Sequence, residues 1–587
     1  MIRAHHLPES RPCTTVRLFI KARKIADRDV LSKSDPICIV YEKTSGKRES
    51  CYAPVVKNTF QDPEWIERGR TEMIKNNLNP EFTRNVTLSY YFEETQLLRF
   101  ELYDVDSHNV ADLTKHDFLG RYECPLARIV SFTKIRGHLE IGPDRGKLWK
   151  DGDDFLEYGS ITIRGEEDNN LDEVSFDVEG ENLDKKMLMN PDPYLVFIRH
   201  YDDGNSHPVY TSELKRSTRN PFWKRISIAV QALCGKDHNA PITIECYDKG
   251  QIRKLKTKKK QARKGRSYQN SGILILSAAK IVKQHSFLDY IAGGTQLEFS
   301  IAIDFTASNG PIRDPRSLHY LFKDRPNQYE IAIKACLAIC QYYNYSKTFD
   351  VYGFGARLPH ERTVSSLFNL NYLEKSPSVT GIRGVARAYR NALSNVELFG
   401  PSNFTPVIKC VADKASDMMA DSSRYQILLI ITDGEITDMN NTIDTIINAS
   451  SLPLSIIIIG VGNDEFNLME MLDSDDHLLR NGATVAQRDI VQFVRMRSFL
   501  NEGGTYLDPD IVMQNLAREV LYEVPAQLTS YMKSRGFTPK PANSPWPRPQ
   551  PPPEYDEAMD NLALYESVSP PPPPIGFNVE RSPQTNN

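Results

Sequence analysis

Two apolar runs in the C-terminal half of the chain each end in an aspartate. The run LEFSIAIDF carries Asp304, and hydroxyl side chains follow at alternate positions as Thr306 and Ser308. The run ILLIITDG ends in Asp433. Parallel strands that end at one edge of a sheet would bring these oxygens together, where open α/β sheets bind ligands. Carboxylates and hydroxyls suit Mg²⁺, so we expect a metal-dependent binding site and not a catalytic pocket.

A second group of carboxylates lies in the N-terminal part of the chain, in the segments ADRDVLSKSDP, YDVD and KHDFLG. Its members are Asp29, Asp35, Asp104, Asp106 and Asp117. Loops at one end of a β-sandwich would bring them together, and so many like charges repel unless a cation neutralises them. About six to eight oxygen ligands in mobile loops suit Ca²⁺. Asp112 competes for the fifth place, and we expect Asp27 to lie outside the ligand shell.

Antiparallel sandwiches would position these carboxylates. Over residues 13–145, short apolar runs such as TTVRLFIKA and LLRFELYDVD alternate with polar turns, as in a β-sandwich. The pattern returns over residues 150–285, beginning with YGSITIRG. NNLNPEF matches STRNPFW, FELYDVD matches IECYDKG, and SDP matches PDP. The sequence therefore predicts two copies of one sandwich, preceded by a disordered tail over residues 1–12.

Strands alternate with helices over residues 290–535. LEFSIAIDF, FDVYGFG, QILLIITDG and LSIIIIGVG read as buried strands, separated by helical patterns such as QYEIAIKACLAICQYY, SVTGIRGVARAYRNAL and TPVIKCVADKASDMMA. Such alternation predicts a doubly wound α/β domain with a parallel sheet. Cys336 and Cys340 lie within the first of these helical patterns and read as small buried hydrophobes.

The motif DxTxS at residues 304–308 resembles the DxSxS motif of von Willebrand factor A (vWA) domains. The resemblance implies a second element of the site, a loop that supplies a hydroxyl. In GPSNFTPVI this is Ser402, with Thr405 as the alternative. It also implies that Asp433 completes the site and that magnesium or manganese occupies it.

The segments SDP, NNLNPEF, YDVD and DFLG resemble a calcium-dependent, phospholipid-binding C2 domain, whose aspartate positions fall on the five carboxylates named above. Two C2 domains followed by a vWA-like domain resemble the copines. SYQNSGILILSAAKI, GFGAR, ILLIITDGEITDM and RDIVQFV are similar to copine segments, and the resemblance covers residues 13–535. It implies calcium-dependent binding to phospholipid, with the vWA-like domain recruiting intracellular protein partners.

The second C2 copy departs from the family pattern. Lys185, Lys186 and Met187 stand where the first loop should have an aspartate, and Gly250 replaces a second aspartate. In place of DFLG stands RKLKTKKKQARKGR, residues 253–266. This segment is either a solvated loop or a contact for anionic lipid. In the second case each basic residue near the membrane would contribute about 1 kcal/mol to binding. The lysines proposed for lipid contact are Lys254, Lys256, Lys258, Lys259 and Lys260.

Composition bounds where the protein acts. The net charge of −4 gives no general preference for nucleic acid, and nine cysteines without paired spacing indicate a reducing compartment. The N-terminus MIRAHHLPESRP lacks the apolar core of a secretory signal. We therefore predict a cytoplasmic protein that moves to anionic phospholipid at the plasma membrane or at other cytoplasmic membrane faces.

Catalytic motif sets are missing from the sequence. It contains no P-loop, no kinase set, no GxSxG and no HExxH. We predict a non-enzymatic adaptor. The alternatives are a C2-targeted enzyme, a kinase or lipid hydrolase, and an extracellular adhesion protein with an integrin-like A domain. The missing signal and the missing disulfide pattern argue against the second alternative.

Residues 537–587 are rich in proline and are predicted to be disordered or polyproline II. They contain Pro552, Pro553 and Tyr555 in the order Pro-Pro-x-Tyr, a motif that docks on WW-domain grooves. The motif is either a docking site for a WW-domain partner or part of a solubilising tail.

Overall fold

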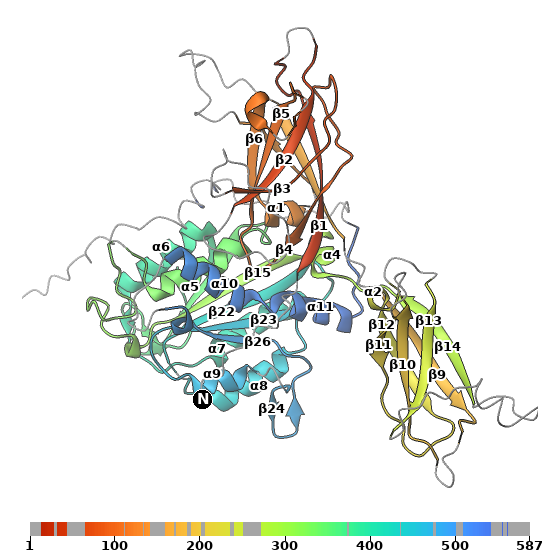
Figure 1. The fold of residues 1–587 in the computed structure, drawn as a ribbon. Coiled ribbons are helices and arrows are strands. Elements are labelled where there is room, and N and C mark those ends of the chain that lie inside the picture. The colour runs from red at the N-terminus through yellow and green to blue at the C-terminus, as the bar shows by residue number, and fades with distance from the viewer. Residues whose placement is uncertain are drawn as a thin grey trace, which may run out of the picture. The chain divides into compact units, whose positions relative to one another are not determined.

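The computed structural model describes residues 13–28, 32–43, 65–107, 109–110, 112–132, 134–140, 159–168, 172–184, 190–200, 206–234, 240–249, 272–323, 325–371, 375–434, 436–473, 477–500, 509–541, 555 and 560. The chain forms two compact units (Figure 1). One unit runs to Asp168 and resumes at Phe287, and the other spans Asn169–Ser286. No helix among the described residues is both long enough and apolar enough to cross a membrane.

The N-terminal part of the first unit is a sandwich of two four-stranded antiparallel sheets. One sheet contains, in spatial order, β4 (Val86–Tyr90), β1 (Thr14–Arg23), β8 (Ser160–Glu167) and β7 (Lys134–His138). The other contains β3 (Trp65–Arg70), β2 (Pro36–Lys43), β5 (Leu97–Asp104) and β6 (Asp117–Pro125). Alternate residues of β1 and β4 are buried, as expected for strands with one face on the core. Helix α1 (Leu126–Phe132) follows β6, and η1 (Leu113–Lys115) precedes it.

Strand β8 corrects the predicted boundary between the two sandwiches. The sequence assigned YGSITIRG to the second copy, but β8 pairs with β1 from Val16↔Glu167 to Arg23↔Ser160. It pairs with β7 on its other edge. A strand with alternating apolar residues fits either sandwich equally well, so only the pairing decides its place.

The second unit is a smaller sandwich of two three-stranded sheets. One sheet contains β11 (Ser206–Thr211), β10 (Pro193–His200) and β13 (Ile242–Asp248), and the other β12 (Phe222–Ala229), β9 (Glu173–Glu181) and β14 (Ile273–Val282). The short helix α2 (Val230–Leu233) follows β12. Trp223 and Phe197 are the largest fully buried side chains of its core.

The C-terminal part of the first unit is built on a mixed sheet whose central strands are parallel. In spatial order these are β16 (Thr348–Phe354), β15 (Gln296–Asp304), β22 (Arg424–Thr432), β23 (Leu454–Gly460) and β26 (Val491–Arg495). The short strands β19 (Phe368–Asn369) and β20 (Ser378–Thr380) pair antiparallel with β16. The predicted doubly wound α/β architecture is therefore present.

Helices cover both faces of this sheet (Figure 1). Ile301 and Ile303 pack in one core with α5 (Gln328–Cys340), α6 (Gly381–Asn395), α10 (Pro509–Leu521) and α11 (Val524–Ser534). Ala302 and Ile430 pack in the opposite core with α7 (Thr405–Ser416), α8 (Met439–Ala449) and α9 (Asn467–Leu472). Successive residues of a strand face opposite sides, so a continuous apolar run supplies both cores.

The remaining elements are short. They are α4 (Phe287–Ala292), η3 (Ala307–Asn309), η4 (Met496–Phe499), β17 (Ala356–Arg357), β18 (Val364–Ser365), β21 (Glu397–Leu398), β24 (Arg480–Asn481) and β25 (Thr484–Val485).

Local sequence explains how the helices begin. Asn327 and Glu330 form a capping box at the start of α5, so the predicted helix begins there. Helix α6 begins later than predicted, because Ser378, Val379 and Thr380 form β20 instead. Cys336 and Cys340 are buried on α5 as predicted, and burial raises the pKa of Cys336 to about 12.

The first sandwich packs directly on the α/β domain. Phe92 meets Phe287 edge to face at 4.8 Å and Tyr343 at 5.0 Å, and the hydroxyls of Tyr90 and Tyr343 hydrogen-bond to each other. Nearby, Arg518 of α10 pairs with Glu94 at 3.1 Å. The first sandwich and the α/β domain are therefore joined by a buried aromatic cluster with polar contacts beside it.

The C-terminal segment is partly docked, which corrects the expectation of a disordered tail from residue 537 onwards. The carbonyl of Phe537 accepts a hydrogen bond from the Tyr290 hydroxyl at 2.9 Å. Further along, Asp560 is buried against the domain.

Candidate functional site

The switch point of the parallel sheet lies between β15 and β22. Numbered by their order in the chain, the parallel strands run 2-1-3-4-5 across the sheet, so connections leave β15 and β22 in opposite directions. In sheets of this order ligands bind outside the carboxyl ends of the strands at that point. Asp304 ends β15, and Asp433 directly follows β22. The sheet therefore places both carboxylates at its binding edge.

Asp304 is fully buried, and hydroxyl and amide donors surround its carboxylate. Thr306 donates to Asp304 Oδ1 from its backbone N–H at 2.8 Å and from Oγ1 at 2.6 Å. Oδ2 accepts from Thr432 Oγ1 at 2.6 Å and from Ser402 Oγ at 3.4 Å. Both oxygens are thus oriented by side chains from three segments of the chain.

Asp433 joins the same cluster through the hydroxyls that follow β15. Ser308 Oγ donates to Asp433 Oδ1 at 3.0 Å, and Thr306 Oγ1 lies 3.4 Å from the same oxygen. The hydroxyls of Thr306 and Ser308 are 2.8 Å apart. All five residues expected at this site, including Ser402, therefore lie in one hydrogen-bonded cluster.

Thr405, the alternative to Ser402, lies outside the cluster. It begins helix α7, where its N–H donates to Asp438 at 3.0 Å and its hydroxyl lies 3.3 Å from that of Thr442. The geometry therefore favours Ser402 over Thr405 as the hydroxyl of the second element.

Burial makes the ionised forms of the two carboxylates costly. It is the main cause that raises the pKa of Asp304, and burial followed by the charge of Asp304 raises the pKa of Asp433 to about 7. Among the described residues, no Lys or Arg side chain forms an ion pair with either carboxylate. A cation would relieve both the burial cost and the mutual repulsion.

The donor set fits a hard divalent cation. It contains two carboxylates and three hydroxyls, all of them oxygen donors, which suit magnesium or manganese rather than zinc. Over the described ranges, no cluster of three or more His, Cys, Asp or Glu side chains has metal-binding geometry. The candidate donor set therefore depends on the hydroxyls of Thr306, Ser308 and Ser402 as well as on the two carboxylates.

Three residues that support the site carry no signal that we recognised in the sequence. Thr432 binds Asp304 from the last position of β22. Gly355 has a φ of +77°, and a Cβ there would lie 2.4 Å from the Thr306 side chain. His319 lies on the carbonyl of Asp304, with Nε2 2.9 Å from that oxygen. Thr432 could have been suspected from its place beside Asp433 in ITDG.

His319 acts on the site through the backbone. It stacks on Tyr329 at 4.2 Å, and burial lowers the pKa of His319 to about 3, so the ring is neutral. A carbonyl can only accept, so Nε2 carries the proton and Nδ1 accepts from the Tyr389 hydroxyl at 2.9 Å. This single tautomer fixes the end of β15.

The carboxylates of the first sandwich gather at one end. The N–H of Asp35 donates to Asp104 Oδ1 at 2.6 Å, and Asp35 Oδ1 in turn accepts from the N–H of Asn76 at 2.7 Å. The N–H of Asp117 donates to Asp106 Oδ2 at 3.2 Å, and Asp104 pairs with Asp117 across β5 and β6. Backbone contacts therefore bring four of the five predicted aspartates to one end of the sandwich, but no three of their carboxylates have metal-binding geometry among the described residues, and Asp29 lies outside those residues.

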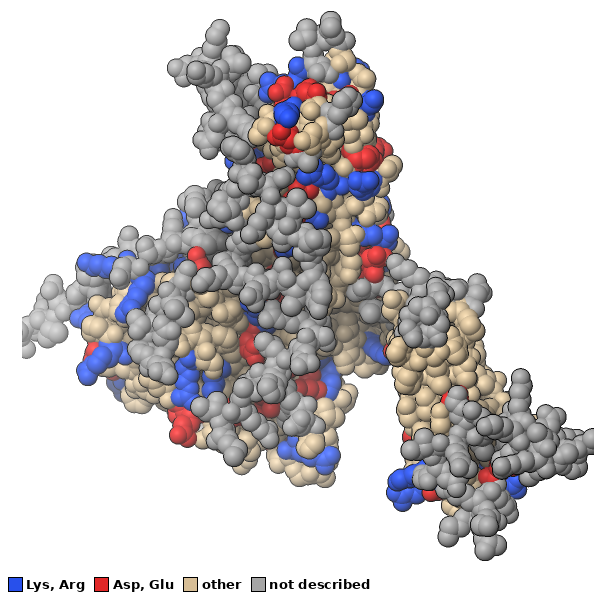
Figure 2. Space-filling model, viewed as in Figure 1, with Lys and Arg blue, Asp and Glu red and all other residues tan. Residues whose placement is uncertain are grey.

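The competitor Asp112 is engaged elsewhere. Its carboxylate accepts from Thr114 Oγ1 at 2.6 Å and pairs with Lys115 at 3.0 Å. Asp112 is also the N-cap of η1. Asp27 accepts from the N–H of Ser34 at 3.3 Å. Figure 2 shows acidic side chains at this end of the sandwich with basic side chains beside them. The geometry thus favours Asp117 over Asp112.

Other predicted residues lie wholly or partly outside the described ranges. The five lysines of residues 253–266 are outside them, as are Pro552 and Pro553. Tyr555 is described, and its hydroxyl lies 3.5 Å from Asp560 Oδ2.

Comparison with known proteins identifies the family. Residues 317–540 match the copine family, and residues 15–141 and 176–259 match the C2 domain. Nicotinic receptor-associated protein 1 of Caenorhabditis briggsae is 53% identical over 594 residues, which cover 94% of this chain and 94% of that protein. The protein of the same name from Caenorhabditis elegans is 51% identical over 608 residues, covering 97% and 96%.

Likeness to solved structures is weak over the whole chain. The calcium-bound pair of C2 domains of extended synaptotagmin 2 is 17% identical and covers 47% of this chain and 99% of its own, with a TM-score of 0.19. That score is too low to carry a conclusion. Identity of 53% over nearly the full length of both proteins is sufficient, and the chain belongs to the copine family.

Proposed function

We propose that this chain is a non-enzymatic adaptor that binds phospholipid membranes in response to calcium and holds a protein partner through its α/β domain. The observation that carries the proposal is the position of Asp35, Asp104, Asp106 and Asp117 at one end of the first C2 domain, linked by backbone contacts. With Asp29, these residues would hold calcium through oxygen donors alone. Bound calcium reverses the negative field of this end, so that lipid phosphate can approach.

Liposome co-sedimentation tests the membrane half of the proposal. The full chain should sediment with phosphatidylserine vesicles in calcium and remain in solution in chelator. Asp106→Asn removes one charge at an exposed position whose side chain accepts only the Asp117 N–H among the contacts described, so calcium-dependent sedimentation should be lost. Asp248→Asn removes one charge from the second C2 domain, serves as the control, and should sediment like the wild type. Sedimentation of Asp106→Asn at the wild-type calcium concentration would refute the assignment.

The α/β domain is proposed to be vWA-like, with magnesium or manganese held by Asp304, Thr306, Ser308, Ser402 and Asp433. A carboxylate from the partner protein could complete the coordination of such a metal. The relatives are named for association with a nicotinic receptor, so we propose a membrane receptor as the class of partner.

Calorimetric titration of the full chain with Mg²⁺ or Mn²⁺ tests this site. Thr306→Val keeps the shape of the side chain and removes the hydroxyl that binds Asp304 at 2.6 Å, so metal affinity should fall at least tenfold. Thr405→Val removes a hydroxyl outside the cluster and should leave the affinity unchanged. Equal affinities for the two variants would exclude this donor set.

The lysine-rich segment and the proline-rich motif complete the proposal. Lys254, Lys256, Lys258, Lys259 and Lys260 would add a calcium-independent, salt-sensitive attraction to anionic lipid. Pro552, Pro553 and Tyr555 would bind a WW-domain protein. The chain would act in the cytoplasm and at the plasma membrane or other cytoplasmic membrane faces. Unchanged low-salt liposome binding after neutralisation of the five lysines would remove the first of these two roles.

A further inference from the structure

A carboxylate from the C-terminal tail is seated on the N-terminus of helix α6. Asp560 is only 3% exposed. Its Oδ2 accepts from the N–H of Ile382 at 2.9 Å, and its Oδ1 accepts from the N–H of Arg383 at 2.8 Å. These residues are separated from Asp560 by 178 and 177 positions in the chain. The contact is therefore tertiary and cannot be a local turn.

The start of α6 lacks a cap of its own. The first N–H groups of a helix have no partner within it, and Thr380 at the N-cap makes no side-chain hydrogen bond to them. Gly381 follows with a φ of +66°, and a Cβ there would lie 2.5 Å from Asp560 Oδ1. The glycine thus leaves the room that the tail carboxylate fills. A negative charge at this position also interacts favourably with the helix dipole.

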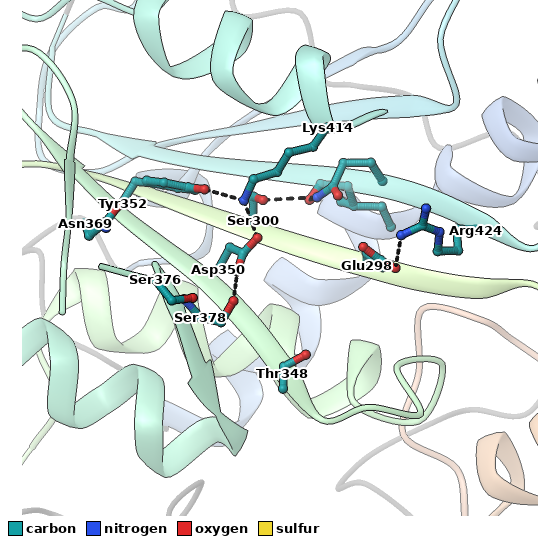
Figure 3. A network of polar contacts seen from close by, with 12 residues as sticks. Glu298, Ser300, Thr348, Asp350, Tyr352, Asn369, Ser376, Ser378, Lys414 and Arg424 are labelled. Atoms are coloured by element: carbon teal, nitrogen blue, oxygen red, sulfur yellow. Dashed lines mark hydrogen bonds and ion pairs between the residues drawn. The ribbon is translucent and has the colours of Figure 1, made fainter. Parts of the chain in front are cut away.

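The sheet holds in place the start of α6, whose N–H groups bind Asp560. Strand β20 runs directly into α6 and pairs with the start of β16, and the N–H of Gly381 donates to the carbonyl of Lys347 at 2.7 Å. Figure 3 shows Ser378 of β20 bonded to Asp350, which also pairs with Lys414. These contacts hold the start of α6 independently of Asp560.

The seated carboxylate lies next to the Pro-Pro-x-Tyr motif. Tyr555 is half-buried, and its hydroxyl lies 3.5 Å from Asp560 Oδ2. WW-type grooves bind this motif as extended polyproline II, and the tyrosine side chain belongs to the bound motif. A tyrosine held beside Asp560 is not free to enter such a groove.

We propose that Asp560 is a built-in acidic ligand for the N-terminus of α6, and that this contact is a latch which a WW-domain partner must open to bind Tyr555. The second part rests on the proposed role of the Pro-Pro-x-Tyr motif. The first part stands on the seated carboxylate alone.

The latch and the candidate metal site lie at opposite ends of the parallel strands. Thr380 pairs with Thr348 at the start of β16, whereas Asp304 ends the parallel strand β15 beside Phe354 at the end of β16. Opening the latch should therefore leave magnesium affinity unchanged, which separates an effect on the tail from a general loss of structure.

Hydrogen exchange on the full chain tests the latch itself. Asp560→Ala should speed exchange of the Ile382 and Arg383 amides by about tenfold or more, because their acceptors are lost. Asp560→Asn keeps one acceptor oxygen and should give a smaller increase. Glu557→Ala removes the same charge from a nearby position and should change neither amide. Wild-type exchange rates in Asp560→Ala would overturn the latch.

Binding of a purified WW domain selected for Pro-Pro-x-Tyr peptides tests the coupling. A partner's apparent affinity falls with the fraction of binding-competent chains. Full-length Asp560→Ala should thus bind about three- to tenfold more tightly than the wild type. Synthetic peptides of residues 546–562, one with the wild-type sequence and one with Asp560→Ala, should bind equally, since they have no α6 to dock on.

The outcomes separate the two parts of the inference. If full-length wild type and Asp560→Ala bind the WW domain equally while the peptides bind it, the coupling is wrong. If the wild-type peptide does not bind, the proposed role of the motif fails, and the exchange rates of Ile382 and Arg383 alone decide the latch.

Discussion

In the first sandwich the N–H of Asp35 donates to Asp104 Oδ1 at 2.6 Å, and in the second the N–H of Asp192 donates to Asp248 Oδ1 at 2.9 Å. The parallel continues one loop away. Asp35 accepts from the N–H of Asn76 at 2.7 Å, and Asp192 from the N–H of Ser217 at 2.6 Å. One loop framework is thus built twice, atom for atom, although only one copy has a full set of acidic residues.

The difference indicates which aspartates distinguish a candidate calcium site from the shared loop fold. The aspartates of SDP and YD bind backbone amides in both copies, so they shape the loops whether or not a cation is bound. Asp106 and Asp117 are the described positions at which the first copy adds carboxylates beyond this frame. Motif matches that rest on SDP and YD alone therefore predict the loop fold, and the additional carboxylates predict the metal.

The two copies also differ in how they are embedded. The first shares a continuous core with the α/β domain, through Phe92, Phe287 and Tyr343. The second has its own core around Trp223 and forms a separate compact unit. We therefore expect the first sandwich to unfold together with the α/β domain and the second to unfold by itself.

The largest expected effect tests that separation. Phe100→Ala and Trp223→Ala each remove a fully buried ring and should lower the free energy of unfolding of their own unit by about 3–5 kcal/mol. Hydrogen exchange should accelerate in the α/β helices only for Phe100→Ala. Phe222→Ala, at a 47% exposed position, should stay within about 0.5 kcal/mol of the wild type. Faster exchange of the α/β helices in Trp223→Ala would show that the units are not independent.

A second prediction contrasts the buried acidic site of the α/β domain with the loops of the sandwiches. The folded pKa of Asp433 is raised to about 7, above the unfolded value of about 3.9, so the folded state binds more protons between these values. The free energy of unfolding of the metal-free chain should thus fall by about 1–4 kcal/mol from pH 4 to pH 7. Thermal unfolding with Mg²⁺ should show a smaller fall.

Asp433→Asn provides the control for this pH dependence. The amide cannot titrate, so the part of the slope that comes from Asp433 and its reversal by Mg²⁺ should disappear, whereas Asp304, whose pKa burial also raises, keeps its own part. A slope of the same size in the variant would show that Asp433 does not contribute and that Asp304 or another group titrates instead.

A third prediction uses the matched aspartates of the two loop frameworks. Asp104→Asn and Asp248→Asn each keep an oxygen that can accept the backbone amide and remove one charge. Calcium at about 100 times its dissociation constant should stabilise the wild type by about 2.7 kcal/mol. Asp104→Asn should lose most of this gain and Asp248→Asn none of it, as measured by thermal unfolding with and without calcium. Equal losses would make both sandwiches calcium sites.

The smallest expected effect concerns the join between the first sandwich and the α/β domain. Tyr343→Phe leaves the buried Tyr90 hydroxyl without the partner it has in the wild type, at a cost of about 1–3 kcal/mol. Exchange should rise on both sides of the join, in β4 and in α5. Tyr194→Phe, within the second sandwich, should leave both elements unchanged. An effect confined to β4 would mean that the join carries little of the stability of the first unit.

Much of this molecule is readable from local pattern. Alternating apolar residues predicted the sandwiches, and apolar runs between helical patterns predicted the doubly wound sheet. Asp304 and Asp433 were predicted as a pair because strand ends at one sheet edge must lie close together. Ser402 was predicted through the family resemblance, and its 3.4 Å contact with Asp304 places it in the cluster.

Other features could not be read this way, because they depend on partners distant in the chain. β8 fits either sandwich by its pattern, and only its pairing with β1 assigns it to the first. His319 has no motif around it, yet it fixes the carbonyl of Asp304. The tail composition indicates disorder, although Asp560 finds two amides on α6.

The sequence by itself determined which residue types are present, the strand and helix periods, and the order of the domains, because each of these depends on neighbours a few positions apart. Tertiary structure alone decided which carboxylates accept backbone amides, which sandwich shares a core with the α/β domain, and where Asp560 is seated. The reason is physical. Burial and hydrogen bonding between distant segments set the energy of a charged side chain, and neither is a property of its local sequence.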